Sequence, residues 1–326
     1  LAELPPPAPF QTAKDNVLKL ALIASGINPL EYSTSLKLRL DPLLPGEQAL
    51  KMISDRLLEI MQQNTSGAIK GNDIEFMHDY RDALSKIRVV LKQFELNYLQ
   101  DSSQHAGQDA GNEYGAFFSR LSELTEPVRD IDVFLMQLEN YEAVFDPSDW
   151  QQLQSLRDYL IRSKVEAQNE LNQELKSSHY RQTINQWRNH LDHSETDGDT
   201  ADDTGIPVHT LADESLGEIN QQALKQGKAI SRKVDTEALH ELRKSFEQLR
   251  YSIDFFSSIY PAVELRVLRQ SLADIQDDLG IADDRHQQVG KVQAFIQQSE
   301  DEAAIKAAEE LIQILQQQQD EAGKDF

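Results

Sequence analysis

The stretch DIEFMHDYRDALSKIR, residues 73–88, recurs as DTEALHELRKSFEQLR at residues 235–250, about half the chain length further on. The two stretches align without a gap at an offset of 162 residues. The matched pairs are Asp73/Asp235, Glu75/Glu237, His78/His240, Arg81/Arg243 and Arg88/Arg250. Each copy has the hydrophobic spacing of an amphipathic helix, so the repeat predicts two similar helical halves.

A helical wheel of 100° per residue puts the histidine and the cations of each copy on one face. In the first copy the polar face holds His78, Arg81, Ser85, Arg88 and Lys92, and the opposite face holds Phe76, Tyr80, Leu84, Ile87, Leu91 and Phe94. In the second copy His240, Arg243 and Arg250 share a face, opposed by Leu242, Phe246, Leu249, Ile253 and Phe256. Each helix is therefore expected to pack its apolar stripe into a bundle and to present its cations on the other side.

The rest of the chain predicts an all-α fold, because helical periodicity dominates from Glu47 onward and strand signals are almost absent. The predicted helices are 47–63, 73–100, 112–125, 128–142, 147–173, 176–193, 211–230, 235–258, 261–279, 282–298 and 301–319. The acidic, glycine-containing segment HSETDGDTADDTGIP at 193–207 interrupts them and is expected to be an exposed linker.

A second pair of segments, LSELTEPVRDIDV (121–133) and LADIQDDLGIADD (272–284), shares a weaker pattern of leucine, acidic and apolar positions. The two matches together predict two similar helical bundles related by a pseudo-twofold axis, with a basic furrow between them. The predicted parts are an N-terminal extension (1–46) and a helical domain (47–320), with bundle one at about 47–193 and bundle two at about 208–320.

The composition excludes several classes of function. The chain has no cysteine, which excludes thiolate chemistry and fits a reducing compartment, so a cytoplasmic location is expected. The formal net charge of −23 argues against nonspecific binding to nucleic acids or to anionic membranes. Screening limits surface fields to about 8 Å at physiological salt, so the charge at a site matters more than the sum.

Two cationic helix faces that confront each other need an anion between them. One source is internal carboxylates, of which the sequence offers Asp79, Asp130, Asp132, Glu241, Asp283 and Asp284. The other source is a phosphate-rich ligand, which arginine binds in a bidentate manner and lysine as a point charge. For one copy alone, the simpler interpretation is a solvated helix face with scattered cations. Because the histidine and the arginines recur in the same phase in the second copy, this interpretation is weaker for the pair.

At these residues the chain resembles the CHAD domain, the conserved-histidine α-helical domain. The motifs are MHDYRDALSKIRVVLK, LTEPVRDIDVFL, KQGKAISRKVDTEALHELRKSFEQLRYSIDFF and LADIQDDLGIADD, in that order over about 47–300. The resemblance implies two four-helix bundles about a pseudo-twofold axis. It also implies binding of inorganic polyphosphate in a basic central cleft, and in some members association with storage granules and so with granule surface proteins.

Carried over by position, the resemblance predicts a polyphosphate site. Its residues are His78, Arg81, Lys86, Arg88, Lys92, Arg129, Lys225, Lys228, His240, Arg243, Lys244 and Arg250. The chain has Ser85, Glu247 and Gln248 where the family often has arginine or lysine. Glu247 lies about 20° from His240 on the wheel, inside the expected basic face. Either it pairs with a neighbouring arginine, or the second half binds phosphate more weakly.

Residues 17–49 (VLKLALIASGINPLEYSTSLKLRLDPLLPGEQA) resemble the junction found where a CHAD domain follows a CYTH domain, so a CYTH–CHAD protein is one origin for this chain. The Glu-x-Glu-x-Lys signature of the CYTH tunnel is absent, so no triphosphatase activity is expected. We expect a non-enzymatic binding module without cofactor or metal. The alternatives are a protein–protein scaffold at storage granules and, on the weak His78-Asp79 signal, a metal-dependent phosphohydrolase.

Overall fold

In this computed structural model, helix α3 (Ile74–Phe94) contains the first copy of the repeat and helix α9 (Thr236–Phe255) contains the second. The structure describes residues 36, 38–94, 107–142, 144–193, 205–230 and 236–322. Asp73 accepts the backbone N–H of Glu75 at 3.0 Å, so the predicted start of the first copy is confirmed. The matching Asp235 lies outside the described residues, as do most of the predicted linker at 193–207 and residues 1–35.

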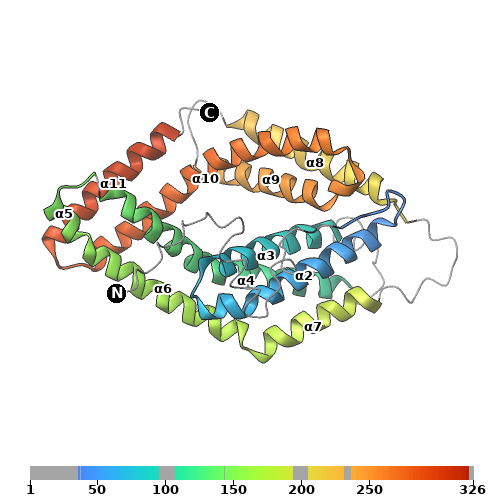
Figure 1. Ribbon diagram of the computed structural model, residues 1–326, viewed down its shortest axis with the longest axis horizontal. Helices are drawn as coiled ribbons and strands as arrows, with labels where there is room; N and C mark the ends of the chain where they lie inside the picture. The colour runs from blue at the N-terminus through green and yellow to red at the C-terminus, as the bar shows by residue number, and fades with distance from the viewer. Residues whose placement is uncertain are drawn as a thin grey trace, which may run out of the picture. The chain divides into compact units, whose positions relative to one another are not determined.

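The all-α prediction is confirmed (Figure 1). The other helices are α2 (Gly46–Lys70), α4 (Gly107–Leu138), α5 (Pro147–Gln152), α6 (Gln154–Leu175), α7 (Ser178–His193), α8 (Val208–Ala229), α10 (Ala262–Gln298) and α11 (Glu302–Ala322), with single 3-10 turns at Glu139–Tyr141 and Ser257–Ile259. Within the described ranges β-pairing is limited to one isolated bridge between Pro45 and Pro207. At this bridge Gly46 N–H donates to the Ile206 carbonyl and Val208 N–H to the Leu44 carbonyl, each at 2.8 Å, which joins the starts of α2 and α8.

Several predicted helix ends are wrong. The predicted helices 112–125 and 128–142 form one helix, α4, which runs through Pro127, and 261–279 and 282–298 form α10. Proline removes one backbone hydrogen bond, yet packing on both sides keeps α4 helical, with Leu124 and Val128 buried. The helix predicted at 147–173 instead breaks at Leu153.

Helix α2 also continues well beyond its predicted end at residue 63 and ends at Lys70. Asn64, a residue that favours turns, is fully buried here, and its amide donates to the Ile60 carbonyl at 2.9 Å. The helix is capped by Gly71, whose φ of 62° lies in the left-handed region and whose N–H bonds the Gly67 carbonyl. Tertiary burial thus overrides the local turn signal of the sequence.

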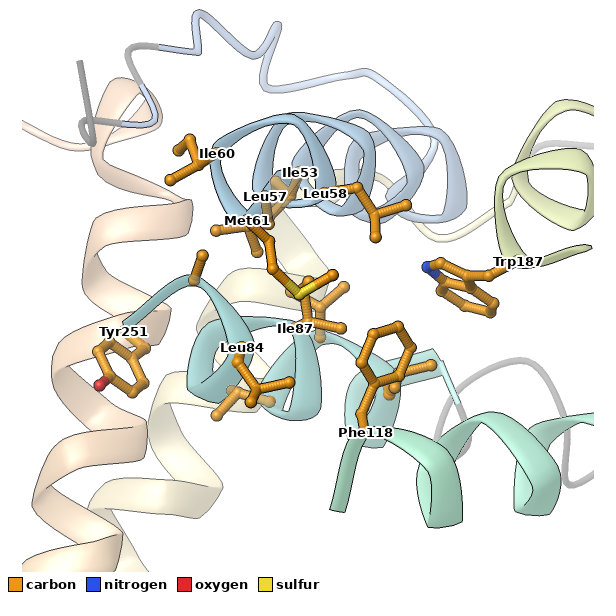
Figure 2. Close-up of a cluster of buried hydrophobic side chains, with 14 of the residues drawn as sticks. Ile53, Leu57, Leu58, Ile60, Met61, Leu84, Ile87, Phe118, Trp187 and Tyr251 are labelled. Carbon is orange, nitrogen blue, oxygen red and sulfur yellow. The ribbon is translucent and has the colours of Figure 1, made fainter. Parts of the chain in front are cut away.

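The largest core cluster lies among α2, α3, α4 and α7 and extends to α8 and α9 (Figure 2). Its apolar side chains follow the helical period predicted from the sequence, for example Leu57 and Met61 on α2 and Leu84 and Ile87 on α3. Tyr251 of α9 lies at the edge of this cluster, beside α3. The cluster therefore fixes where the two copies of the repeat meet.

The other buried clusters lie in the second half and at the end that α5 and α11 form. Two small clusters join α8, α9 and the first part of α10. A further cluster combines the end of α4, α5 and the start of α6 with the end of α10 and α11. This last cluster mixes residues from both predicted bundles, and the division into two four-helix bundles stays a prediction.

Candidate functional site

The polar face predicted for α3 agrees with the burial of its residues. Tyr80, Leu84 and Ile87 are buried, whereas His78 and Arg88 are exposed. Phe76, predicted on the buried side, is 41% exposed. It belongs to the first turn of α3, where its ring covers Gly67 of α2 instead of entering the core.

Arg81 and Arg88 converge on one residue of α4. Arg81 donates from Nη1 to Thr125 Oγ1 at 2.8 Å and to the Ser122 carbonyl at 3.4 Å. Arg88, two turns further along α3, donates from Nη1 to Ser122 Oγ at 3.3 Å. Burial lowers the pKa of Arg81, and the nearby carboxylate of Asp130 partly offsets this effect. Both arginines are thus held by neutral groups and keep donors for a further acceptor.

A second group of cations surrounds the ring of Tyr251 on α9. The Lys86 ammonium of α3 lies 5.4 Å from the ring centroid, and the guanidinium of Arg250 lies 4.9 Å from it. These are cation–π distances. Lys86 also pairs with Asp82 at 2.7 Å, whereas the buried Nε of Arg250 has no hydrogen-bond partner among the described residues.

Glu247 lies beside the second of these groups of cations. It accepts a hydrogen bond from Tyr251 Oη at 2.8 Å, one helical turn along α9. Burial, followed by the negative charge of Glu247, raises the pKa of Tyr251 well above its usual range. The same charge acts to raise the pKa of Arg81. Through Tyr251, Glu247 is therefore close to the cations that the ring contacts, which are Lys86 of α3 and Arg250 of α9.

Arg129 occupies a polar junction between α4 and α10. It donates to Asp130 at 3.1 Å and to Asp284 of α10 at 3.0 Å. Burial lowers the pKa of Arg129, but Asp284 and Asp130 outweigh this effect and raise it overall. Lys291 of α10 lies 4.0 Å from Asp130. With both carboxylates on its guanidinium, Arg129 is less available to an external anion than Arg81 or Arg88.

The remaining predicted residues are more dispersed. Lys92 is exposed on the last turn of α3, and Lys225 and Lys228 are exposed near the end of α8. Lys244 pairs with Glu241 at 2.8 Å on the surface of α9. His240 and Arg243 are half-buried and have partners of their own. The contacts described above join Arg81 with Arg88 at Ser122, and Lys86 with Arg250 at the ring of Tyr251. They do not include these dispersed residues or His78.

The sequence reasoning missed Ser122, Thr125 and Tyr251. Tyr251 had a detectable signal, because it is eleven residues after His240 and so falls about 20° from it on the wheel. An aromatic ring on a basic face is a platform for cations. Ser122 and Thr125 lie in or next to the LTEP motif, but only the packing of α3 on α4 shows that their oxygens meet the arginines of α3.

Other candidate chemistry is sparse in the described part of the chain. The described residues contain no group of three or more histidine, aspartate or glutamate side chains positioned to hold a metal ion. None of the described helices is long and apolar enough to cross a membrane. A polar pocket of about 290 Å³ lies between α6 and the end of α10, and its lining does not include Arg81, Arg88 or Arg250. It is lined by Ser155, Asp158, Tyr159, Arg162, Phe295, Gln298 and Ser299.

Comparisons with known proteins agree with the fold. The crystal structure of the CHAD domain from the plant Ricinus communis matches with a TM-score of 0.71 and 22% identity, over 86% of this chain and 89% of that chain. PptA from Streptomyces chartreusis matches with a TM-score of 0.63 and 12% identity, over 85% and 96%. No curated protein sequence matches the chain. The family model of the CHAD domain matches residues 53–290, which is more than half of the chain, and the chain therefore belongs to the CHAD domain family.

Proposed function

We propose that this chain is a non-enzymatic, cytoplasmic module that binds inorganic polyphosphate through the cations between α3, α4 and α9. The observation that carries the proposal is the state of Arg81, Arg88 and Arg250. In the part of the chain that the structure describes, none of the three forms an ion pair with a carboxylate. Their contacts are hydroxyl groups, a carbonyl and an aromatic ring.

This arrangement suits a chain of phosphates. Arginine presents a planar fork of donors that matches phosphate oxygens, and such charge-assisted bonds are stronger than those between neutral groups. Arg81 and Arg88 come from one helix, and Arg250 comes from the matching helix of the other half. A linear polyanion can contact all of them at once, whereas a single phosphate contacts only one or two.

The net charge of −23 does not oppose the proposal. Fields between exposed charges are screened over about 8 Å at physiological salt. Arg81 and Arg250 are partly buried by their neighbours and Arg88 is exposed, so a ligand at the site experiences mainly the local cations. The other predicted residues, among them His78, His240, Lys225 and Lys228, extend the proposed site on the same helices or next to them.

The test is calorimetric titration of the purified protein with medium-chain polyphosphate at about 50 and 200 mM salt. If three phosphate contacts release counterions as single-stranded nucleic acids do, the affinity should fall about twentyfold between these conditions. Saturable binding with this salt dependence supports the proposal. Binding that does not change with salt, or no binding at 50 mM salt, contradicts it and favours a protein–protein scaffold at storage granules.

A further inference from the structure

Glu247 is a carboxylate placed among cations without neutralising any of them at close range. Its hydrogen bond of 2.8 Å comes from the neutral phenol of Tyr251. Among the described residues no lysine or arginine comes within ion-pair distance of Glu247, whereas Asp82 pairs with Lys86 and Asp284 pairs with Arg129. The charge of Glu247 is thus kept at the site but is not bound by a cation.

Tyr251 holds this carboxylate in place. Only 3% of Tyr251 is exposed, and its ring lies against Lys86 of α3 and against Arg250 of its own helix, α9. Figure 2 shows Tyr251 at the edge of the apolar cluster that contains Leu84 and Met61. A ring packed in this way cannot swing out to solvent, so its hydroxyl keeps Glu247 near the arginines.

The charge of Glu247 is felt on both sides of the site. It contributes to the raised pKa of Tyr251 on its own helix, and on α3 it is a minor influence that opposes the lowering of the pKa of Arg81 by burial. The hydrogen bond of 2.8 Å places the carboxylate next to Tyr251, whose ring contacts Lys86 of α3 and Arg250 of α9. A phosphate that binds Arg81 and Arg250 together must approach the same carboxylate and is repelled by it.

We infer that Glu247, positioned by Tyr251, is a specificity-determining residue that weakens anion binding at the cluster of Arg81, Arg88 and Arg250. This inference rests on the proposed polyphosphate function. The site then retains only ligands whose other contacts offset the repulsion, which favours a chain of phosphates over a single small anion. Tyr251 acts as a positioning residue, since it controls the carboxylate and need not touch the ligand.

Removing the charge should therefore strengthen binding. Glu247→Gln keeps the size of the side chain and an oxygen that can accept from Tyr251. If the removed charge is about 8 Å from one unit charge on the bound phosphate, and the effective dielectric constant is between about 20 and 80, the affinity for polyphosphate should rise by about twofold to thirtyfold. Tyr251→Phe removes the anchor but keeps the ring, so its affinity should lie between that of the wild type and that of Glu247→Gln.

The experiment measures polyphosphate affinity by calorimetry for the wild type, both single variants and the double variant. Tyr251→Phe should have no effect once Glu247 is glutamine, because the anchor then holds no charge. The control is Glu310→Gln on α11, which changes the net charge by the same amount. This helix packs on α5 in a core cluster to which α3 and α9 contribute no described residue, so the variant should leave the polyphosphate affinity unchanged. Thermal unfolding of each variant checks that the fold is retained.

The outcomes separate this inference from the proposed function. Tighter binding by Glu247→Gln, with Glu310→Gln unchanged, supports the inference. Wild-type binding that Glu247→Gln does not strengthen overturns the inference and leaves the proposed function in place. Binding by Glu247→Gln alone supports the inference and shows that the native chain is not a polyphosphate binder. No binding by either protein overturns both.

Discussion

Arg129 on α4 donates a hydrogen bond to Asp284 on α10 at 3.0 Å, across 155 residues of sequence. These two residues belong to the two segments that form the weaker internal match, LSELTEPVRDIDV and LADIQDDLGIADD. The repeated segments therefore meet each other directly and connect the two halves of the chain. Asp130 and Lys291 extend the same polar junction.

Replacing Asp284 with asparagine should destabilise the protein by about 1 kcal/mol. The reason is that the partly buried guanidinium of Arg129 loses one of its two charged partners. The free energy of unfolding in urea measures this effect. The matched control is Glu59→Gln, which removes a carboxylate from the exposed pair with Arg56 and should change stability by less than about 0.5 kcal/mol. Equal effects of the two substitutions would show that the junction adds nothing beyond a surface pair.

Neutralising single arginines should rank the residues of the proposed site. Arg81→Gln, Arg88→Gln and Arg250→Gln should each weaken polyphosphate binding about tenfold, the loss expected from one charge-assisted hydrogen bond. Lys228→Gln gives the comparison with the edge of the proposed site, since this exposed side chain lies near the end of α8 and its loss should weaken binding less. Calorimetry at low salt measures all four. A larger loss for Lys228→Gln than for the arginines would place the ligand elsewhere.

Two helical glycines should respond in opposite ways to alanine. A methyl group added at Gly217 on α8 would meet open space, so Gly217→Ala should stabilise the protein by about 0.5–1 kcal/mol. At Gly67 the same methyl group would lie 2.1 Å from Cγ of Phe76, so Gly67→Ala should destabilise by about 1–3 kcal/mol. Urea unfolding compares the two. If Gly67→Ala stabilises as Gly217→Ala does, the Phe76 ring does not cover α2.

The buried tyrosines predict a loss of stability in alkali. Burial raises the pKa of Tyr80 and Tyr251 well above 10, so the folded state keeps phenolic protons that the unfolded state releases near pH 10. Stability from these groups is complete below pH 10 and falls as the pH rises above it, by up to about 1.4 kcal/mol per pH unit for each tyrosine.

Tyr80→Phe tests this alkaline effect. The variant should have a shallower decline of unfolding free energy above pH 10, while its difference from the wild type stays constant between pH 7 and pH 9. Tyr80 donates to Tyr180 at 3.5 Å, a long contact, so the loss of this hydroxyl should cost little at neutral pH. Parallel curves for the two proteins above pH 10 would show that Tyr80 does not keep its proton.

Local patterns predict some features of this fold well. The helical phase of α3 follows from apolar spacing, because the side that packs must be continuous along a helix. Asp73 is identified as a helix start because its side chain can accept a free N–H of the first turn. Helix ends such as those at Pro127 and Asn64 are predicted wrongly, because burial against neighbours outweighs a local preference of about 1 kcal/mol.

The sequence by itself determined the all-α class, the internal repeat, the phase of the polar face of α3 and the family resemblance. Only the tertiary structure decided which cations are engaged by carboxylates, as Arg129 is, and which bond neutral groups, as Arg81 and Arg88 do. It also decided that Tyr251, whose ring meets Lys86 of α3, anchors Glu247 on α9. The physical reason is that periodicity specifies the direction of a side chain around its own helix, whereas its partners depend on which helices pack together and at what height.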